Sequence, residues 1–391
     1  MSEMEYKRLS DCAALGKDRT RDINYESYIS TENMIKDKGG VTIASSLPAS
    51  KTASAYSPND ILLSNIRPYF RKIWYADKNG SCSNDVLVVR ANEDIDSKFL
   101  YYVLSDNNFF NYDTVTSKGT KMPRGTQTAI MKYLVPDINV SKQRKIANIL
   151  STYDNLIENN NKRISLLEQM AENLYKEWFV RFRFPGYENT KFTDGIPLDW
   201  QILRMSDFCY VTDGTHDTPK PINDGGVPLV TGKCIKNGFI DFNEPYNISY
   251  QDHESISKRS GLQTGDILFS NIGTVGTTCF VNYDREFSVK NVIIFKPGNI
   301  KVSNYLYSWL NSDSIQAIFA TQTNGASQQF VGLNFMRRFK ILVPNENVLD
   351  LYSDRIKSIR TEIVKLHDIN ENLTKQRDML LPRLMRGKLE V

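Results

Sequence analysis

The segment Asn59-Asp60-Ile61-Leu62-Leu63-Ser64-Asn65-Ile66 decides the fold, because it occurs a second time, 206 residues later, as Gly265-Asp266-Ile267-Leu268-Phe269-Ser270-Asn271-Ile272. The segment Phe99-Leu100-Tyr101-Tyr102-Val103-Leu104 recurs at the same separation as Tyr305-Leu306-Tyr307-Ser308-Trp309-Leu310. Two matches in one register indicate an internal repeat. The chain therefore contains two diverged, collinear copies of one domain.

Each copy is predicted to be an irregular α/β domain. The apolar runs Val86 to Val89 and Val292 to Phe295 predict strands between turn-rich loops, and the second repeated segment predicts a short helix in each copy. A third matching pair, Tyr133-Leu134-Val135-Pro136 and Ile341-Leu342-Val343-Pro344, lies 208 residues apart. It predicts that each domain ends on an apolar strand closed by a proline.

A long helix is predicted after each domain, because apolar residues there recur at alternating steps of three and four, as along a coiled-coil seam. The span from Leu150 to Trp178 would be about 42 Å long at roughly 1.5 Å per residue. Phe184-Pro185-Gly186 is expected to break the first helix, and Pro382 to end or kink the second. The predicted seam consists of Leu150, Tyr153, Ile157, Asn160, Ile164, Leu167 and Leu174 in the first helix, and Leu349, Tyr352, Ile356, Ile359, Ile363, Leu366, Asn370 and Leu373 in the second.

We therefore predict an α+β protein in which two α/β domains are separated by two long helices that pair as an antiparallel coiled coil, with a pseudo-twofold internal repeat. The predicted divisions are a first domain at 1–143, a central helix at 144–184, a second domain at 185–346 and a C-terminal helix at 347–391. The alternative is that each helix packs only against its own domain. Asn160 and Asn370 either fix the register of the pair or lie where the seam is wet.

The composition is that of a globular protein of two or three domains. The 391 residues are 40% hydrophobic and 24% charged, with 49 basic and 45 acidic side chains. No run of 18 apolar residues and no secretion signal is present, so we expect a cytoplasmic protein with no membrane association. The five cysteines are widely separated and form no CxxC pair, which suggests neither a disulfide framework nor a zinc site.

The motifs of several enzyme classes are missing. The sequence has no GxGxxG, no GxxxxGK[ST], no adjacent prolines and no nucleophile elbow. Its three histidines have no metal-ligand spacing. These absences favour recognition over catalysis, with no catalytic residue, no metal and no cofactor in this chain.

Two polar loops carry the chemistry that remains. The basic loop, Ser117 to Gln127, begins a stretch from Val115 to Lys145 with seven basic residues and one acidic residue. Such charges suit phosphates, and Arg, Lys, Asn and Gln suit base edges; the alternative is a solvated basic loop. The matching segment of the second copy, Thr323 to Gln329, carries amides instead, and Asp213 to Lys220 is a further polar loop there. The two copies would then read different bases.

The whole chain resembles the DNA-specificity subunit of type I restriction-modification systems. The resemblance rests on the domain and helix order, on Tyr28-Ile29-Ser30-Thr31-Glu32-Asn33, on Asn173-Leu174-Tyr175-Lys176-Glu177-Trp178-Phe179, and most of all on the end, Gln376-Arg377-Asp378-Met379-Leu380-Leu381-Pro382-Arg383-Leu384-Met385-Arg386-Gly387. In the second domain Trp200 leads to Asp213-Gly214-Thr215-His216. The first domain lacks this tryptophan-bearing opening, so the two belong to different recognition subtypes.

The resemblance implies a non-catalytic reader of DNA. Each domain would bind one half of a bipartite, asymmetric site, and the helices would set the spacer between the halves. Two adenine-methyltransferase subunits would dock on the chain and bring S-adenosylmethionine, and translocase-nuclease subunits would bring ATP and Mg. The competing interpretations are a coiled-coil scaffold without DNA function and a diverged DNA methyltransferase or nuclease.

The candidate DNA contacts come from both domains. Ser64-Asn65 and Ser270-Asn271 are alternatively structural turns that hold the repeated strand. The candidates are Arg67, Lys118, Thr120, Lys121, Arg124, Thr215, His216, Lys220, Asn271, Gln328 and Gln329.

Overall fold

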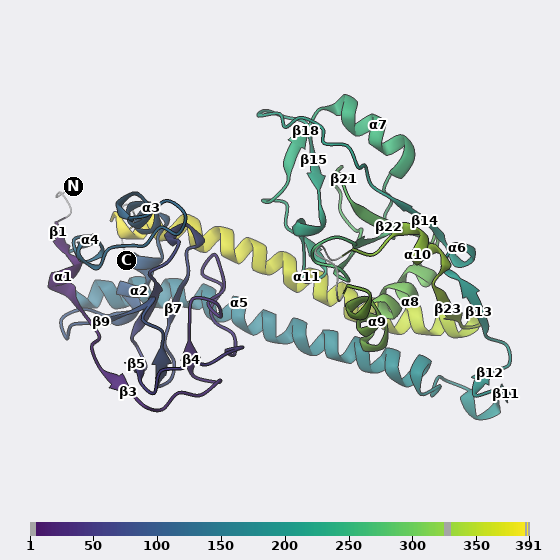
Figure 1. Ribbon diagram of the computed structural model, residues 1–391, viewed down its shortest axis with the longest axis horizontal. Helices are drawn as coiled ribbons and strands as arrows, with labels where there is room; N and C mark the ends of the chain where they lie inside the picture. Colours follow the sequence, from purple (N-terminus) through teal and green to yellow (C-terminus); the bar gives the residue numbers. More distant parts are fainter. Residues whose placement is uncertain (1–4, 324–329, 388, 390–391) are drawn as a thin grey trace. The chain divides into compact units, whose positions relative to one another are not determined.

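The chain divides into two compact units in a computed structural model that describes residues 5–323, 330–387 and 389. Unit 1 comprises Met1–Asn161 and Asp368–Val391, and unit 2 comprises Lys162–His367. Each unit therefore contains one copy of the repeated domain and a part of each long helix (Figure 1).

The repeated segment forms the same inner strand of a four-stranded antiparallel sheet in both units. In unit 1 the order is β2-β9-β6-β7, and in unit 2 it is β14-β22-β19-β20. Ile61 of β6 pairs with Val89 of β9, and Ile267 of β19 pairs with Phe295 of β22, so the register is repeated too. The strands predicted at 86–89 and 292–295 are confirmed. The bounds are β2 (Ala13–Leu15), β6 (Ile61–Ser64), β7 (Ile73–Tyr75), β9 (Val86–Ala91), β14 (Tyr210–Asp213), β19 (Ile267–Ser270), β20 (Thr278–Phe280) and β22 (Val292–Lys296).

A buried ion pair explains why the acid in the repeated segment is the same in both copies. Asp60 is 2% exposed and lies 2.8 Å from the Arg90 guanidinium. Asp266 is 4% exposed and forms an ion pair with Lys296. Each carboxylate also accepts a hydrogen bond from the main-chain N–H three residues earlier. Buried charges are tolerated when they are paired in this way.

Short strands and helices complete unit 1. Strand β1 pairs with β10, and β3-β5-β8-β4 form a second sheet. Helix α2, which was predicted from the repeat, begins at the Asp96 cap, whose side chain accepts a hydrogen bond from Phe99 N (2.9 Å). The bounds are β1 (Tyr6–Arg8), α1 (Leu9–Cys12), β3 (Arg19–Thr20), β4 (Tyr28–Ile29), β5 (Ala53–Tyr56), β8 (Gly80–Cys82), α2 (Ser97–Ser105), α3 (Asn107–Thr116), α4 (Gln127–Ile130) and β10 (Leu134–Pro136).

Unit 2 follows the same plan. Strand β13 pairs with β23, β18-β15-β21 form a sheet, and α8 is the second predicted short helix, capped by Asn299. The bounds are β11 (Phe192–Thr193), β12 (Ile196–Pro197), β13 (Gln201–Arg204), α6 (Met205–Phe208), β15 (Val227–Val230), β16 (Ile235–Lys236), β17 (Phe239–Ile240), β18 (Tyr246–Ile248), α7 (Tyr250–Ser260), β21 (Ser288–Val289), α8 (Ile300–Leu310), α9 (Asp313–Thr323), α10 (Leu333–Arg338) and β23 (Lys340–Val343).

The two long helices are α5 (Val140–Tyr175) and α11 (Glu346–Met385). A π-helical turn, Lys176–Val180, follows α5. Pro382 was expected to end or kink the second helix, and the helix does not end there but continues to Met385. Leu381, Leu384 and Met385 are buried in the core of unit 1, and this packing favours helix in the last turn despite the missing proline N–H.

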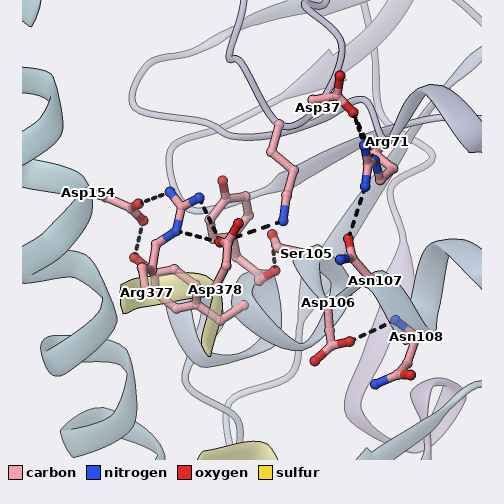
Figure 2. A network of polar contacts seen from close by, with 12 residues as sticks. Asp37, Arg71, Ser105, Asp106, Asn107, Asn108, Asp154, Arg377 and Asp378 are labelled. Carbon is pink, nitrogen blue, oxygen red and sulfur yellow. Dashed lines mark hydrogen bonds and ion pairs between the residues drawn. The ribbon is translucent and has the colours of Figure 1, made fainter. Parts of the chain in front are cut away.

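In unit 1 the two helices meet through polar side chains. Asn160 Nδ2 donates to Asn370 Oδ1 (2.9 Å), and both amides are 9% exposed. About two turns away, the Arg377 guanidinium lies 2.6 Å from Asp154 Oδ1 and 2.9 Å from Asp378 Oδ1; Figure 2 shows both contacts. Tyr102 of α2 donates to the same Asp154. The residue numbers rise along one helix while they fall along the other, so the two segments of unit 1 run antiparallel.

In unit 2 the same helices meet through an ion pair and through rings. Arg163 lies 2.8 Å from Glu362, and the Trp178 and Tyr352 ring centres are 5.7 Å apart. These contacts also run antiparallel. Arg360 of α11 donates to Asn304 and Ser308 of α8, and this ties the helix to the domain.

The predicted seam positions are all buried or partly buried, whereas exposed apolar residues of α5, such as Leu156 and Leu166, lie off the seam. Leu150 belongs to the core of unit 1, and Tyr352 and Ile356 belong to the core of unit 2. The ends of the seam thus pack into the domains. Among the described residues no helix combines the length and the apolar character needed to cross a membrane.

Candidate nucleic-acid interface

The basic loop is attached to the end of strand β6 by main-chain hydrogen bonds. Lys118 and Arg124 exchange both of their N–H···O bonds (2.9 Å each) and thereby close the loop. Arg67 N donates to Pro123 O (2.8 Å), and Gly125 N donates to Asn65 O (3.0 Å). The backbone at the loop's ends is therefore held by the sheet, which is how a scaffold presents side chains for binding. The side chains of Lys118, Thr120, Lys121 and Arg124 are exposed.

Arg124 is the candidate whose side chain is oriented by a partner. Its guanidinium lies 2.9 Å from Asp85, and the two side chains are 50% and 36% exposed. An exposed pair of this kind contributes less than about 1 kcal/mol. A guanine edge or a phosphate can therefore replace Asp85 at low cost.

A cationic cluster, which we define as Lys36, Arg67 and Lys72, surrounds the ring of Phe70. The Lys36 Nζ, Lys72 Nζ and Arg67 Cζ atoms lie 5.0, 5.8 and 5.9 Å from the ring centre. Burial, together with the charges of Lys36 and Arg67, lowers the pKa of Lys72. In the described part of the chain no carboxylate forms an ion pair with these three side chains. Three such cations repel one another, and a phosphate placed among them would relieve that repulsion.

Sequence reasoning found Arg67 but missed Lys36 and Lys72. The count of charges along the chain identified the stretch from Val115 to Lys145, whose seven cations fall on separate elements: the basic loop, the turn after α4, and the start of α5. Lys36 stands beside Asp37 and 34 residues before Phe70, so only folding brings it to the ring. Lys72 follows Arg71, two residues after Phe70, in a short basic run that the count over longer stretches did not single out.

In unit 2 the loop that contains His216 is held by side chains. His216 Nε2 lies 2.8 Å from Asp213 Oδ2, and Nδ1 lies 2.9 Å from Asn291 Oδ1, while 62% of the side chain remains exposed. Arg259 forms an ion pair with Asp213 (2.7 Å). Lys220 is exposed at the end of the loop. Two of the three candidates in this loop thus lie at the surface.

Two candidates of the second domain have buried side chains. Thr215 is 8% exposed, and its Oγ1 accepts a hydrogen bond from Asp217 N (3.1 Å). Asn271 is 6% exposed; its Nδ2 donates to Val331 O (3.3 Å), and its carbonyl accepts from Val331 N (3.0 Å). Asn271 thus holds its loop as Asn65 holds Gly125, which agrees with the alternative of a structural turn. Gln328 and Gln329 lie outside the described residues.

In the described part of the chain no group of three or more His, Cys, Asp or Glu side chains is arranged to hold a metal ion. The cysteines at 12, 82, 209, 234 and 279 are free and buried.

Comparisons with known proteins point to one family. The family model described as "Type I restriction modification DNA specificity domain" matches residues 1–169 and 197–375. The MjaIX specificity subunit of a type I restriction enzyme from Methanocaldococcus jannaschii is 24% identical over 75% of this chain and 69% of its own length. The MjaVIII specificity subunit from the same organism is 22% identical over 94% of this chain and 87% of its own length.

The fold has a counterpart among solved structures. The crystal structure of a type I restriction-modification system S subunit from M. genitalium superposes with a TM-score of 0.56 at 14% identity, over 98% of this chain and 97% of that one. This similarity supports the overall fold.

Proposed function

Because the chain belongs to the family of type I restriction-modification DNA specificity domains, we propose that it reads one bipartite, asymmetric DNA sequence, with each recognition domain contacting one half. The expected resemblance is confirmed by the family model and by the specificity subunits that it resembles. The chain is a non-catalytic specificity subunit whose role is the recognition of a DNA target.

One observation carries the proposal of two independent readers: the units share a sheet and a loop attachment but differ in loop chemistry. Asn65 and Asn271 accept a main-chain hydrogen bond from Gly125 and Val331, which occupy matching positions 206 residues apart. Cations (Lys118, Lys121 and Arg124) precede Gly125 in the first copy, whereas the segment 323–329, which precedes Val331 in the second copy, carries amides. Guanidinium groups suit guanine and amides suit adenine, so equivalent scaffolds would read different bases.

The exposed candidates are proposed as the contacts to DNA. Arg124 would read a base edge, and the cationic cluster would bind phosphates. Thr215 and Asn271, whose side chains are buried, would position the loops rather than touch DNA. The other exposed candidates are Lys118, Thr120, Lys121, His216 and Lys220. Gln328 and Gln329, which lie outside the described residues, are proposed from the sequence alone.

The helices α5 and α11 are proposed to pair as an antiparallel coiled coil that sets the spacer between the half-sites. The antiparallel contacts within each unit and the burial of the seam positions support this proposal. The division into domains at 1–143 and 185–346, with helices at 144–184 and 347–391, belongs to the same proposal.

The partners follow from the proposed role. Two adenine-methyltransferase subunits would dock on this chain and supply S-adenosylmethionine chemistry, and translocase-nuclease subunits, with ATP and Mg, would join for cleavage. The similar proteins from M. jannaschii are named as subunits of type I restriction enzymes, and this supports assembly with other subunits.

The test is to co-express the chain with its methyltransferase subunit and to map the methylated DNA motif by sequencing. Arg124→Ala is expected to relax or abolish recognition in one half of the motif, and Gln328→Ala in the other half, each at about 1 to 3 kcal/mol per lost bidentate contact. Lys51→Ala, which removes an exposed lysine elsewhere in unit 1, is the control. Independent reading is wrong if each variant damages both halves equally.

A further inference from the structure

Asp113 of α3 is a buried acid that the proposed contacts do not use. Its side chain is 0% exposed, and neither carboxylate oxygen has a hydrogen-bond partner among the described residues. Burial raises the pKa of Asp113 to about 7. An ionised carboxylate in such a place is costly, so the neutral acid is the favoured form below that pH.

The acid lies against the residue that ends the basic loop. A Cβ atom built on Gly125 would lie 2.4 Å from Asp113 Oδ1 and 3.1 Å from Asn65 Oδ1. Both oxygens therefore face the same point, and Asn65 Oδ1 is also buried without a partner. We call Asn65, Asp113 and Gly125 the loop neck. The hydroxyl hydrogen of the neutral acid is the donor that Asp113 can offer to a nearby acceptor oxygen, and the ionised carboxylate has none.

Among the described residues no charged side chain forms a hydrogen bond or ion pair with the Asp113 carboxyl group. The elements around α3 contribute Arg67 and Arg71 beside the 3₁₀ turn Pro68–Phe70, Lys118 and Arg124 from the basic loop, and Asp85 before β9. Arg71 forms an ion pair with Asp37, and Arg124 forms one with Asp85. The described hydrogen bonds and ion pairs link none of these five side chains to Asp113.

The second copy shows the same neck without an acid. Phe319 occupies the position that matches Asp113, 206 residues later, and Val331 occupies the position that matches Gly125. Phe319 is 1% exposed and packs on Phe269, with ring centres 4.9 Å apart. The main-chain hydrogen bond to Asn271 is nevertheless kept. A loop can therefore be attached at this point without a carboxyl group, and the acid is a property of the first recognition domain alone.

We propose that Asp113 is a positioning residue for the basic loop: the protonated acid donates a hydrogen bond to Asn65 Oδ1 and holds the Gly125 end of the loop, so base reading by the first domain weakens as the pH rises. The effect on base reading rests on the proposed function, whereas the hydrogen bond that holds the loop concerns the free chain only.

The direction of the pH effect follows from proton linkage. In the closed neck Asp113 is buried and its pKa is about 7, whereas in an open neck, with the Gly125 end of the loop released, its pKa would return to the ordinary 3.8. Between pH 3.8 and about pH 7 the closed neck therefore keeps a proton that the open neck loses. Raising the pH through this window therefore favours opening, and the effect is complete once the pH exceeds about 7. Asp113→Asn keeps a donor at every pH and carries no charge, so it should remove the pH dependence.

The first measurement is the hydrogen-exchange protection of the Gly125 amide in the full free chain from pH 5.5 to 8.5, corrected for the intrinsic exchange rate. As the pH rises, protection in the wild type should fall relative to protection in Asp113→Asn. The fall should reach about tenfold per pH unit in the range where Asp113 is ionised in the open neck but still protonated in the closed neck. The Val331 amide is the control and should show no such difference. Identical pH profiles for wild type and Asp113→Asn at Gly125 would overturn the proposal.

The second measurement uses duplexes that carry the mapped methylation motif, with one base changed in either half, and the chain bound to its methyltransferase subunit. Discrimination in the first half should fall with pH in the wild type and stay constant in Asp113→Asn, and discrimination in the second half should not differ between them. If protection of the Gly125 amide depends on pH but base discrimination in the first half does not, Asp113 positions the loop and the loop does not read the bases. If neither responds, the inference fails while two-half reading stands.

Discussion

Arg124 combines a fixed backbone with a half-exposed side chain that is held only by a surface ion pair with Asp85. Its N–H and C=O are both bonded to Lys118 at 2.9 Å, while half of the side chain is exposed. The cost of ordering the loop is therefore met during folding, and DNA has to immobilise only side chains. The same division holds in unit 2, where Asn271 secures the backbone and His216 lies at the surface.

The cationic cluster gives a prediction about phosphate contacts. Lys36→Ala and Lys72→Ala should each weaken binding to all DNA sequences alike and lower the magnitude of the slope of log K against log salt by about 1, because each removes one phosphate contact. Titrations at several salt concentrations measure this. Lys51→Ala is the matched control. A change in the methylated motif, instead of a uniform loss, would mean that these lysines read bases.

At the scale of elements, the repeated strand and the repeated helix differ in what their sequences specify. Strand β6 and its twin β19 keep the acid that pairs with Arg90 or Lys296, so the segment is recognisable after divergence. In the long helices the two copies share the heptad spacing of apolar residues rather than particular residues. Their seam ends pack into the domain cores, and their middle carries the buried amides Asn160 and Asn370.

The pairing of these amides can be tested by a double-mutant cycle. Asn160→Leu and Asn370→Leu should each lower the free energy of unfolding by about 1 to 3 kcal/mol. The first leaves the buried Asn370 Oδ1 without its donor, and the second removes both the acceptor of Asn160 Nδ2 and the donor to Asn161 Oδ1. The double variant should cost less than the sum, by about 0.5 kcal/mol or more. Urea unfolding measures the three values, and Asn159→Leu, at an exposed position of α5, is the control. Simple additivity would show that the two amides are not coupled.

At the scale of the whole molecule, the proposed spacer role predicts a change in the DNA site when the helices change length. Removing one heptad from α5 and the facing heptad from α11 shortens the pair by about 10 Å. At about 3.4 Å per base pair this is close to three base pairs. The methylated motif of an active variant should keep both half-sequences and show a shorter spacer. An active variant with the original spacer would exclude the helices as a ruler.

Several features were predictable from the sequence because they repeat or follow a period. The offset of 206 residues predicted the strands β6 and β19 and the helices α2 and α8, and a heptad spacing predicted α5 and α11. These patterns arise because a strand or helix buries one face, so apolar residues recur in the sequence with the period of that element. Of the two expectations for Pro382, an end or a kink, the end does not occur, because the packing of Leu384 and Met385 outweighs the local effect of the proline.

The tertiary structure alone decided which side chains meet. Sequence could propose Arg124, but not that Asp85 orients it, that Lys36 and Lys72 join Arg67 around Phe70, or that Asp113 lies unpaired against Gly125. It also could not show that Thr215 and Asn271 are buried. The family, the duplicated domains and the long helices could be read from the linear sequence, because they depend on repeated segments, local motifs and the periodic burial of one helix face. The loop contacts depend on distances between residues far apart in the chain, and only the folded chain sets those distances.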